Sequence, residues 1–184
     1  MKELILSIAL LFSFSPWIGD QPTDAQTPSA PSSLSFEHEA ECGSPLRESM
    51  LWMSVEGKVI KVVEGDTVTV LTKDNKRKHV NLVAVDASAR QVVARRFLSG
   101  LVLNREVSVL VNPSNIESST VLGVIHSQEK DINRALLEAG VVRYHEPEFY
   151  SVSRYTACVY RIVEREARQA RKGFWQNASR KRAI

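Results

Sequence analysis

Residues Gly57–Asp86 read GKVIKVVEGDTVTVLTKDNKRKHVNLVAVD and contain three short runs rich in valine, isoleucine and leucine. Such residues suit a pleated, half-buried strand. Strands are therefore predicted at Val59–Val63, Val68–Leu71 and Val80–Val85. Glu64-Gly65 supplies a short turn after the first run, and the polar residues 73–76 supply a longer turn after the second. The stretch predicts three consecutive antiparallel strands.

Two aspartates lie at the ends of these predicted strands. Asp66 begins the second strand and Asp86 ends the third, so pairing the two strands brings both carboxylates to one end. Close carboxylates repel each other unless a cation lies between them, and calcium prefers such oxygen ligands. One interpretation is a weak calcium site formed by Asp66, Asp86 and the nearby Glu64. The other is structural, with Asp66 in a turn and Asp86 as a helix cap.

The segments after Asp86 predict two further strands and three helices. Apolar residues recur at helical spacing between Gln91 and Leu103. Further strands are expected at Glu106–Val111 and Thr120–His126, and further helices at Ile132–Ala139 and Tyr155–Lys172. Five short strands with a helix between the third and the fourth match the oligonucleotide/oligosaccharide-binding (OB) barrel. The predicted fold class is α+β, a five-stranded OB-fold barrel with three α-helices.

Several motifs resemble those of the thermonuclease, or staphylococcal nuclease-like, family. They are the turn Glu64-Gly65-Asp66-Thr67, the strand ending at Asp86, and the final helix with Ala167, Ala170, Gly173 and Trp175. The similarity covers residues 55–176 and implies one domain over that range with the same barrel. In this family the positions of Asp66 and Asp86 hold calcium, and Glu64 keeps the charge of a third acid in the turn.

The resemblance also implies that the catalytic part of the site has changed. The family's strand-end arginine falls at Asn81, and its water-activating glutamate falls at Ala89. The second arginine falls at Thr120. No catalytic residue is therefore assigned, and the expected cofactor is either none or weakly bound calcium.

Two hypotheses follow for the function. In the first, the domain is a catalytically inactive barrel that acts as a binding or structural module for nucleic acid or a protein. In the second, it is a calcium-dependent nuclease that hydrolyses DNA or RNA with a site rebuilt from other residues. Calcium-dependent cleavage of a single-stranded substrate, with a chelator control, distinguishes the two.

Composition and charge place the chain among soluble globular proteins with one core. It has 184 residues, 43% of them hydrophobic and 24% charged, with a formal net charge of +3. The basic residues gather near the C-terminus, where Arg168, Arg171 and Lys172 precede a basic tail at 177–184. They are candidate contacts for nucleic-acid phosphates, and the alternative is a solvated helix face.

The N-terminal residues predict export. Lys2 precedes an apolar run from Leu4 to Phe14, which fits a signal peptide over residues 1–25. An uncleaved membrane anchor is the alternative, and only then is the membrane a partner. Residues 26–54 are rich in Pro, Ser, Thr, Gln and Glu and predict a flexible linker. The expected location is secreted, periplasmic or extracellular, with nucleic acid or an envelope or extracellular protein as partner.

Cys42 and Cys158 are the two cysteines of the chain. An even number of cysteines in an exported protein favours a disulfide, which here joins the predicted linker to the final helix. The alternative is a free Cys42 and a buried, unpaired Cys158.

Overall fold

The computed structural model describes residues 40–43, 52–147 and 151–177. The predicted signal peptide, most of the predicted linker and the basic tail after Asn177 lie outside these residues. Within the described part of the chain, no helix has both the length and the apolar character required to cross a bilayer.

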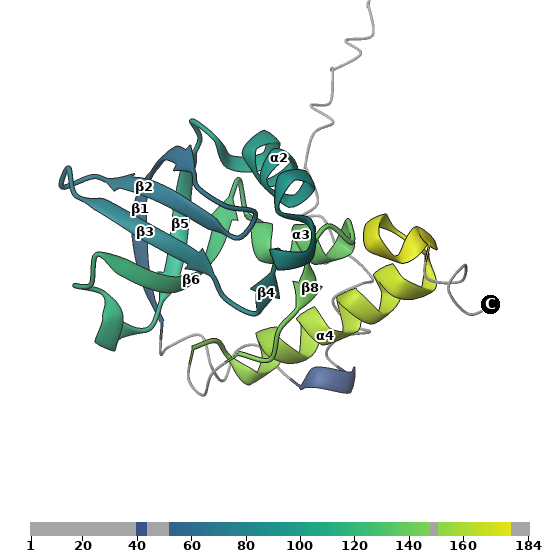
Figure 1. Cartoon of the computed structure of the whole chain (residues 1–184). Helices are drawn as coiled ribbons and strands as arrows, with labels where there is room; N and C mark the ends of the chain where they lie inside the picture. The colour runs from purple at the N-terminus through teal and green to yellow at the C-terminus, as the bar shows by residue number, and fades with distance from the viewer. Residues whose placement is uncertain (1–39, 44–51, 148–150, 178–184) are drawn as a thin grey trace, which may run out of the picture. The chain divides into compact units, whose positions relative to one another are not determined.

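Five strands form a closed barrel (Figure 1). Their bounds are Met53–Val62 for β1, Thr67–Thr72 for β2, Arg77–Leu82 for β3, Glu106–Val111 for β5 and Thr120–Ser127 for β6. β1 pairs antiparallel with β2 and β5, β2 with β3, and β5 with β6. A parallel pairing of β3 with β6 closes the barrel. The predicted α+β class and the five-stranded OB-fold barrel are confirmed.

The barrel interior is filled by β-branched residues that point inward from every strand. Val59, Val68, Val70, Val80, Val109 and Ile125 are almost completely buried. Burial of such side chains is the main favourable contribution to folding. The alternation of these residues with outward polar ones accounts for the success of the strand predictions.

Several strand boundaries differ from the prediction; β3, for example, begins at Arg77, three residues before Val80. β1 begins at Met53, six residues before Val59, because Met53–Lys58 pairs with β5. β3 ends at Leu82, three residues before Val85, because Ala84 has a left-handed backbone with φ of +63°. Val85–Asp86 instead forms β4, which pairs with β8 (Arg143–Tyr144) in a separate two-stranded sheet. The prediction of one strand over Val80–Val85 is therefore wrong at its end.

Among the described residues from 52 onward, three α-helices accompany the barrel, as predicted. α2 covers Gln91–Val102, α3 covers Ile132–Glu138 and α4 covers Arg154–Gln169. α3 packs against α4 and β6, and α2 packs against α3 and β1. The shorter elements are η3 (Ser88–Arg90), η4 (Pro113–Asn115), β7 (Lys130–Asp131) and η5 (Gly173–Asn177).

The helix ends are fixed by local interactions. The Asp131 side chain accepts a hydrogen bond from the backbone N–H of Arg134 at 2.9 Å, so it caps α3. The hydroxyl of the buried Tyr160 in α4 donates to the same carboxylate at 2.7 Å. α4 ends three residues before the predicted Lys172, because Arg171 has a left-handed φ of +52°. A Cβ at Gly173 would clash with the Gly140 carbonyl, so the α4–η5 junction requires glycine.

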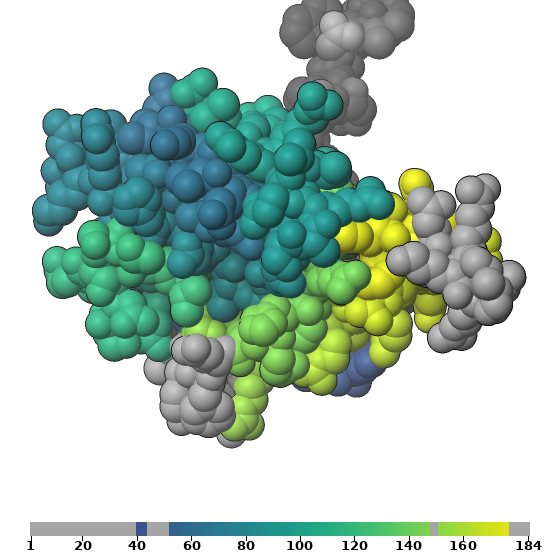
Figure 2. All heavy atoms as spheres, viewed as in Figure 1, coloured from purple at the N-terminus to yellow at the C-terminus, as the bar shows by residue number. Residues whose placement is uncertain are grey.

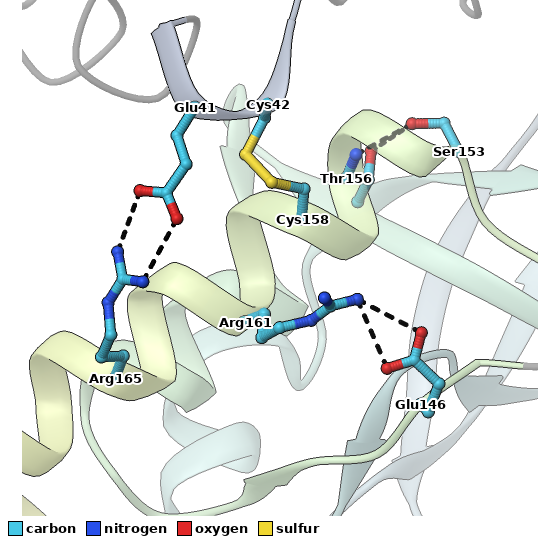
Figure 3. Close-up of a disulfide and its surroundings, with 8 residues drawn as sticks. All are labelled: Glu41, Cys42, Glu146, Ser153, Thr156, Cys158, Arg161 and Arg165. Carbon is cyan, nitrogen blue, oxygen red and sulfur yellow. Dashed lines mark hydrogen bonds and ion pairs between the residues drawn. A yellow bond between two sulfur atoms is a disulfide. The ribbon is translucent and has the colours of Figure 1, made fainter.

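A disulfide joins residues 40–43 to α4 (Figure 3). Cys42 and Cys158 are bonded across a sequence separation of 116 residues. Beside the disulfide, the guanidinium of Arg165 donates to both carboxylate oxygens of Glu41, at 3.0 and 3.2 Å. A crosslink that closes so long a loop stabilises the folded state by about 5 kcal/mol in the chain-entropy account.

Asn133 in α3 connects the two strands that close the barrel. Its side chain is fully buried. Nδ2 donates to the carbonyl of Val83 at 2.9 Å and to that of Gly123 at 3.3 Å. Oδ1 accepts from the N–H of Ile125 at 3.2 Å. One amide therefore satisfies backbone groups just beyond β3 and within β6.

We expect Asn133→Leu to lower the free energy of unfolding by about 2–4 kcal/mol, because buried backbone groups left without a partner cost about 1–3 kcal/mol each. Urea denaturation measures this change. Asn115→Ala, at an exposed site in η4, is the matched control and should change stability by less than about 0.5 kcal/mol. Equal effects of the two substitutions would show that Asn133 does not support barrel closure.

Candidate functional site

Asp66 links the start of β2 to the segment that follows β4. Its backbone carbonyl accepts from the N–H of Leu82 at 2.8 Å. Its carboxylate accepts from the N–H of Ala87 at 3.0 Å and from the Thr67 hydroxyl at 3.3 Å. The Asp66 carboxylate is therefore held against the residue directly after Asp86.

The turn before Asp66 is packed beneath α2. The N–H of Gly65 donates to Oε1 of Gln91 at 2.7 Å. A Cβ at Gly65 would lie 2.6 Å from the Cβ of Ala94 and 2.7 Å from that of Ala87, which no real side chain tolerates. Glycine at this position allows the turn to approach α2 and sets the position of Asp66.

Asp86 lies in β4 at the same corner of the barrel. Oδ1 accepts from the N–H of Ser88 at 2.8 Å. This backbone hydrogen bond is the main reason that the pKa of Asp86 is lowered, with smaller contributions from the Ser88 side chain and the charges of His145 and Arg143. Asp86 is also the antiparallel partner of Arg143 in β8. The carboxylate is therefore stabilised in its charged form.

The acidic residues predicted to bind calcium share this corner but do not form a compact ligand set. Glu64 and Asp66 line a hollow of about 400 Å³, together with Thr67, Asn81 and His145. Asp86 does not line it. Among the described residues, no group of three or more His, Cys, Asp or Glu side chains is arranged to hold a metal ion. The weak calcium site therefore stays a prediction.

The three positions at which the resemblance implies catalytic residues carry neutral side chains at separate places. Asn81 in β3 is the pairing partner of Thr67, whose hydroxyl donates to Oδ1 of Asn81 at 3.2 Å. Thr120 is exposed at the start of β6, opposite His79. Ala89 is exposed in η3. Of these three, only Asn81 lines the hollow.

A cluster of arginines and aromatic rings lies around η5. The Cζ atoms of Arg90 and Arg143 are 5.2 and 5.3 Å from the centroid of the Phe174 ring. Arg143 is also 5.8 Å from the ring of Trp175, and Arg168 is 4.3 Å from it. We call these five residues the arginine–aromatic cluster. Figure 2 shows teal atoms beside the yellow C-terminal segment, in agreement with the contact between Arg90 of η3 and Phe174.

The arginines of the cluster differ in how their charge is balanced. Arg168 donates to the buried carboxylate of Glu164 at 2.8 Å, and Glu164 also accepts from the N–H of Tyr144 at 2.9 Å. Within the described residues, neither Arg90 nor Arg143 has a carboxylate within ion-pair distance. Among the described residues, the cluster therefore presents two guanidinium groups that form no ion pair, and one of them, Arg143, is the pairing partner of Asp86.

The sequence predicts part of this cluster. Arg168 is among the predicted nucleic-acid contacts, and the other two, Arg171 and Lys172, are exposed between α4 and η5. Arg90 and Arg143 are missing from that prediction. Their approach to Phe174 depends on the pairing of β4 with β8, which leaves no periodic pattern in the sequence. The apolar pair Val141-Val142 directly before Arg143 is the one signal in the sequence for an extended segment here.

Comparison with known proteins identifies related chains. The sequence model described as staphylococcal nuclease homologue matches residues 77–177. Protein ParB of Escherichia coli is 28% identical over 149 residues, which cover 70% of this chain and 77% of that protein. An uncharacterized endonuclease of E. coli is 25% identical over 134 residues, with coverage of 70% and 82%. An uncharacterized endonuclease of Haemophilus influenzae is 31% identical over 88 residues, with coverage of 46% and 49%.

We expect calcium to bind the full chain with a dissociation constant of about 1 mM or weaker, because the candidate acids supply only two or three of the roughly six to eight oxygens that calcium takes. Isothermal titration calorimetry measures this affinity, and Asp66→Asn is the matched variant of equal size. A micromolar dissociation constant, with binding lost in Asp66→Asn, would contradict the expectation and show an intact metal site.

Proposed function

The chain belongs to the staphylococcal nuclease homologue family, and from this premise we propose that its barrel binds nucleic acid without hydrolysing it. The proposal has two parts. The first is the loss of catalysis at the corner that holds Asp66 and Asp86. The second is a phosphate-binding surface formed by the arginine–aromatic cluster. The contacts of Arg90 and Arg143 with Phe174 are the observation that carries the proposal.

The loss of catalysis follows from the chemistry of phosphodiester hydrolysis. The reaction requires a base to activate water and positive charge to stabilise the oxygens of the transition state. Asn81, Ala89 and Thr120 provide neither. A positioned base contributes about 10²–10⁴-fold to a rate, and a transition-state arginine contributes about 10³–10⁵-fold in other phosphoryl-transfer enzymes. These losses do not simply multiply, but either one removes most of the activity.

Nucleic-acid binding is supported by the way in which the cluster holds its arginines. A guanidinium group stacked on an aromatic ring is favoured by cation–π attraction and is ordered in advance. Its N–H groups remain free at the edge to bind phosphate oxygens in pairs. Arg143 contacts both Phe174 and Trp175, so two rings constrain it. Arg171 and Lys172 extend the positive surface beyond the end of α4.

We also propose that the domain works outside the cytoplasm. The disulfide between Cys42 and Cys158 supports this location, because disulfides persist in oxidising compartments. The apolar run Leu4–Phe14, with its predicted signal peptide, supports it independently. An envelope or extracellular protein remains the alternative partner for the barrel.

A calcium-dependent nuclease with a rebuilt site is the second candidate function. Three relatives bear the name uncharacterized endonuclease, which favours it. Glu64 lines the same hollow as Asp66 and is the carboxylate that would replace the base in such a site. Arg143, beside Asp86, would replace a missing cation. Cleavage assays separate this function from the one proposed.

We expect the purified full chain to cleave single-stranded DNA in calcium no faster than in a chelator control, because no base is positioned to activate water. Asn81→Arg/Ala89→Glu/Thr120→Arg should gain calcium-dependent cleavage, since it restores the charges that the family uses. Gel electrophoresis of a labelled oligonucleotide measures both rates.

The double variant Asp66→Ala/Asp86→Ala controls for contaminating nuclease. Robust cleavage by the unmodified chain that this variant abolishes would overturn the loss of catalysis. If Glu64→Gln also abolished that cleavage, the rebuilt site would be the correct account.

We expect Arg90→Gln/Arg143→Gln to weaken binding of a single-stranded oligonucleotide at least tenfold, since each charged hydrogen bond contributes about 1.5–3 kcal/mol. Fluorescence anisotropy measures the affinity. The slope of log affinity against log salt should fall by about 1.4, since each lost phosphate contact removes about 0.7 for a single strand.

The matched control is Arg77→Gln/Arg154→Gln, which removes the same charge at two exposed positions in β3 and α4. Far-UV circular dichroism establishes that both double variants are folded. Equal loss of affinity in the two variants would mean that net charge, and not the cluster, governs binding.

A further inference from the structure

The outer face of α2 exposes apolar side chains to solvent. We define this face by Val92, Val93, Arg96, Phe97 and Leu103, the last of which directly follows the helix. Val92 is 82% exposed, Val93 46%, Leu103 39% and Phe97 37%. The opposite side of the helix is fully used in packing, since Ala94, Leu98 and Val102 are buried in the core. The exposed residues are therefore available for a partner without disturbing the fold.

The same face is surrounded by positive charge. From Ala87 to Arg105 the sequence contains four arginines and no carboxylate. Arg95, Arg96 and Arg105 form no ion pair within the described part of the chain. Arg105 instead donates to the carbonyl of Gly100 at 3.4 Å, at the C-terminal end of α2. The partner that complements this surface is apolar and negatively charged.

We propose that the outer face of α2 docks on an anionic phospholipid bilayer. Apolar side chains of a surface helix enter the boundary between headgroups and acyl chains, and basic residues beside them attract anionic headgroups. Val92, Val93 and Phe97 supply the apolar contact, and Arg95 and Arg96 supply the charge. The helix lies on the membrane surface with its buried face still packed on the domain.

The two other partners fit this surface less well. A nucleic acid would satisfy the arginines but would leave Val92 and Phe97 in water. A second copy of the chain would cover the apolar residues but would bring Arg96 toward the arginines of its partner, and such like-charge contacts are unfavourable. An anionic bilayer satisfies both features at once. The inference does not depend on the proposed nucleic-acid binding, which uses Arg90, Arg143 and Arg168.

A local fluorescence probe tests the proposal in the full chain. The apolar run Leu4–Phe14 is expected to bind vesicles by itself, so total vesicle binding is not a suitable measurement. An environment-sensitive dye is attached to Val92→Cys under non-reducing conditions, in which Cys42 and Cys158 are paired. The emission of the dye is recorded with phosphatidylcholine vesicles that contain or lack phosphatidylglycerol.

We expect a shift to shorter wavelength only when phosphatidylglycerol is present. Adding Arg95→Gln/Arg96→Gln to the labelled chain should weaken the lipid-dependent shift about 25-fold in lipid concentration, since each basic residue near an anionic surface contributes roughly fivefold. The same dye at Asn115→Cys, in the connection between β5 and β6 (Figure 1), should show no shift. Circular dichroism establishes that the variants remain folded.

Four results would overturn the proposal. They are no shift at Val92→Cys, a shift of equal size at Asn115→Cys, a shift that is independent of phosphatidylglycerol, and a shift that survives the loss of both arginines. A shift caused by an oligonucleotide but not by vesicles would identify the face as a nucleic-acid surface instead. A shift that rises with protein concentration alone would identify it as an interface between two copies.

Discussion

The parallel pairing of β3 with β6 is the constraint on which the rest of the domain depends. It joins four residue pairs, from His79 opposite Thr120 to Leu82 opposite Gly123, and so removes the open edges of the sheet. Asn133 continues the connection beyond the last pair through its bonds to the backbone. Because β3 stops there, the chain turns at Ala84 and leads Asp86 to the partner strand β8. Closure of the barrel therefore determines where Asp86 lies and places it opposite Arg143 in β8.

The sequence predicts the elements whose burial is periodic and misses those that depend on distant pairing. The barrel strands and all three helices are predictable because apolar residues recur with periods of two and 3.6. The start of β1 is not predictable from this pattern, since Met53 and Ser54 are exposed and belong to the strand only because they pair with β5. The end of β3 is not predictable either, since the valines and the alanine at 83–85 have the composition of a continued strand. Likewise, the sequence locates Asp66, Asp86 and Asn81 by local motif, whereas Arg143 joins the site through tertiary structure.

The proposed function rests on the different places that carboxylates and arginine–aromatic contacts occupy in this domain. The carboxylates of Asp66 and Asp86 remain, and backbone N–H groups of Ala87 and Ser88 stabilise them. The positions at which the resemblance implies arginines, Asn81 and Thr120, carry neutral side chains on the barrel strands. Phosphate would meet the negative charge of two carboxylates at the corner, whereas the rings of Phe174 and Trp175 hold guanidinium groups nearby. We therefore propose that nucleic acid binds at the arginine–aromatic cluster and not at the corner that holds Asp66 and Asp86.

Mapping the bound oligonucleotide by NMR chemical-shift perturbation in the full chain tests this central claim most directly. The account predicts that the Nε–H signals of Arg90, Arg143 and Arg168 and the indole N–H of Trp175 shift as a short single strand is added. The side-chain amide of Asn81 and the backbone N–H of Thr120 should stay unchanged. Shifts confined to Asn81 and Thr120, with the arginine signals unchanged, would contradict the account. They would show that phosphate binds at the corner of the barrel.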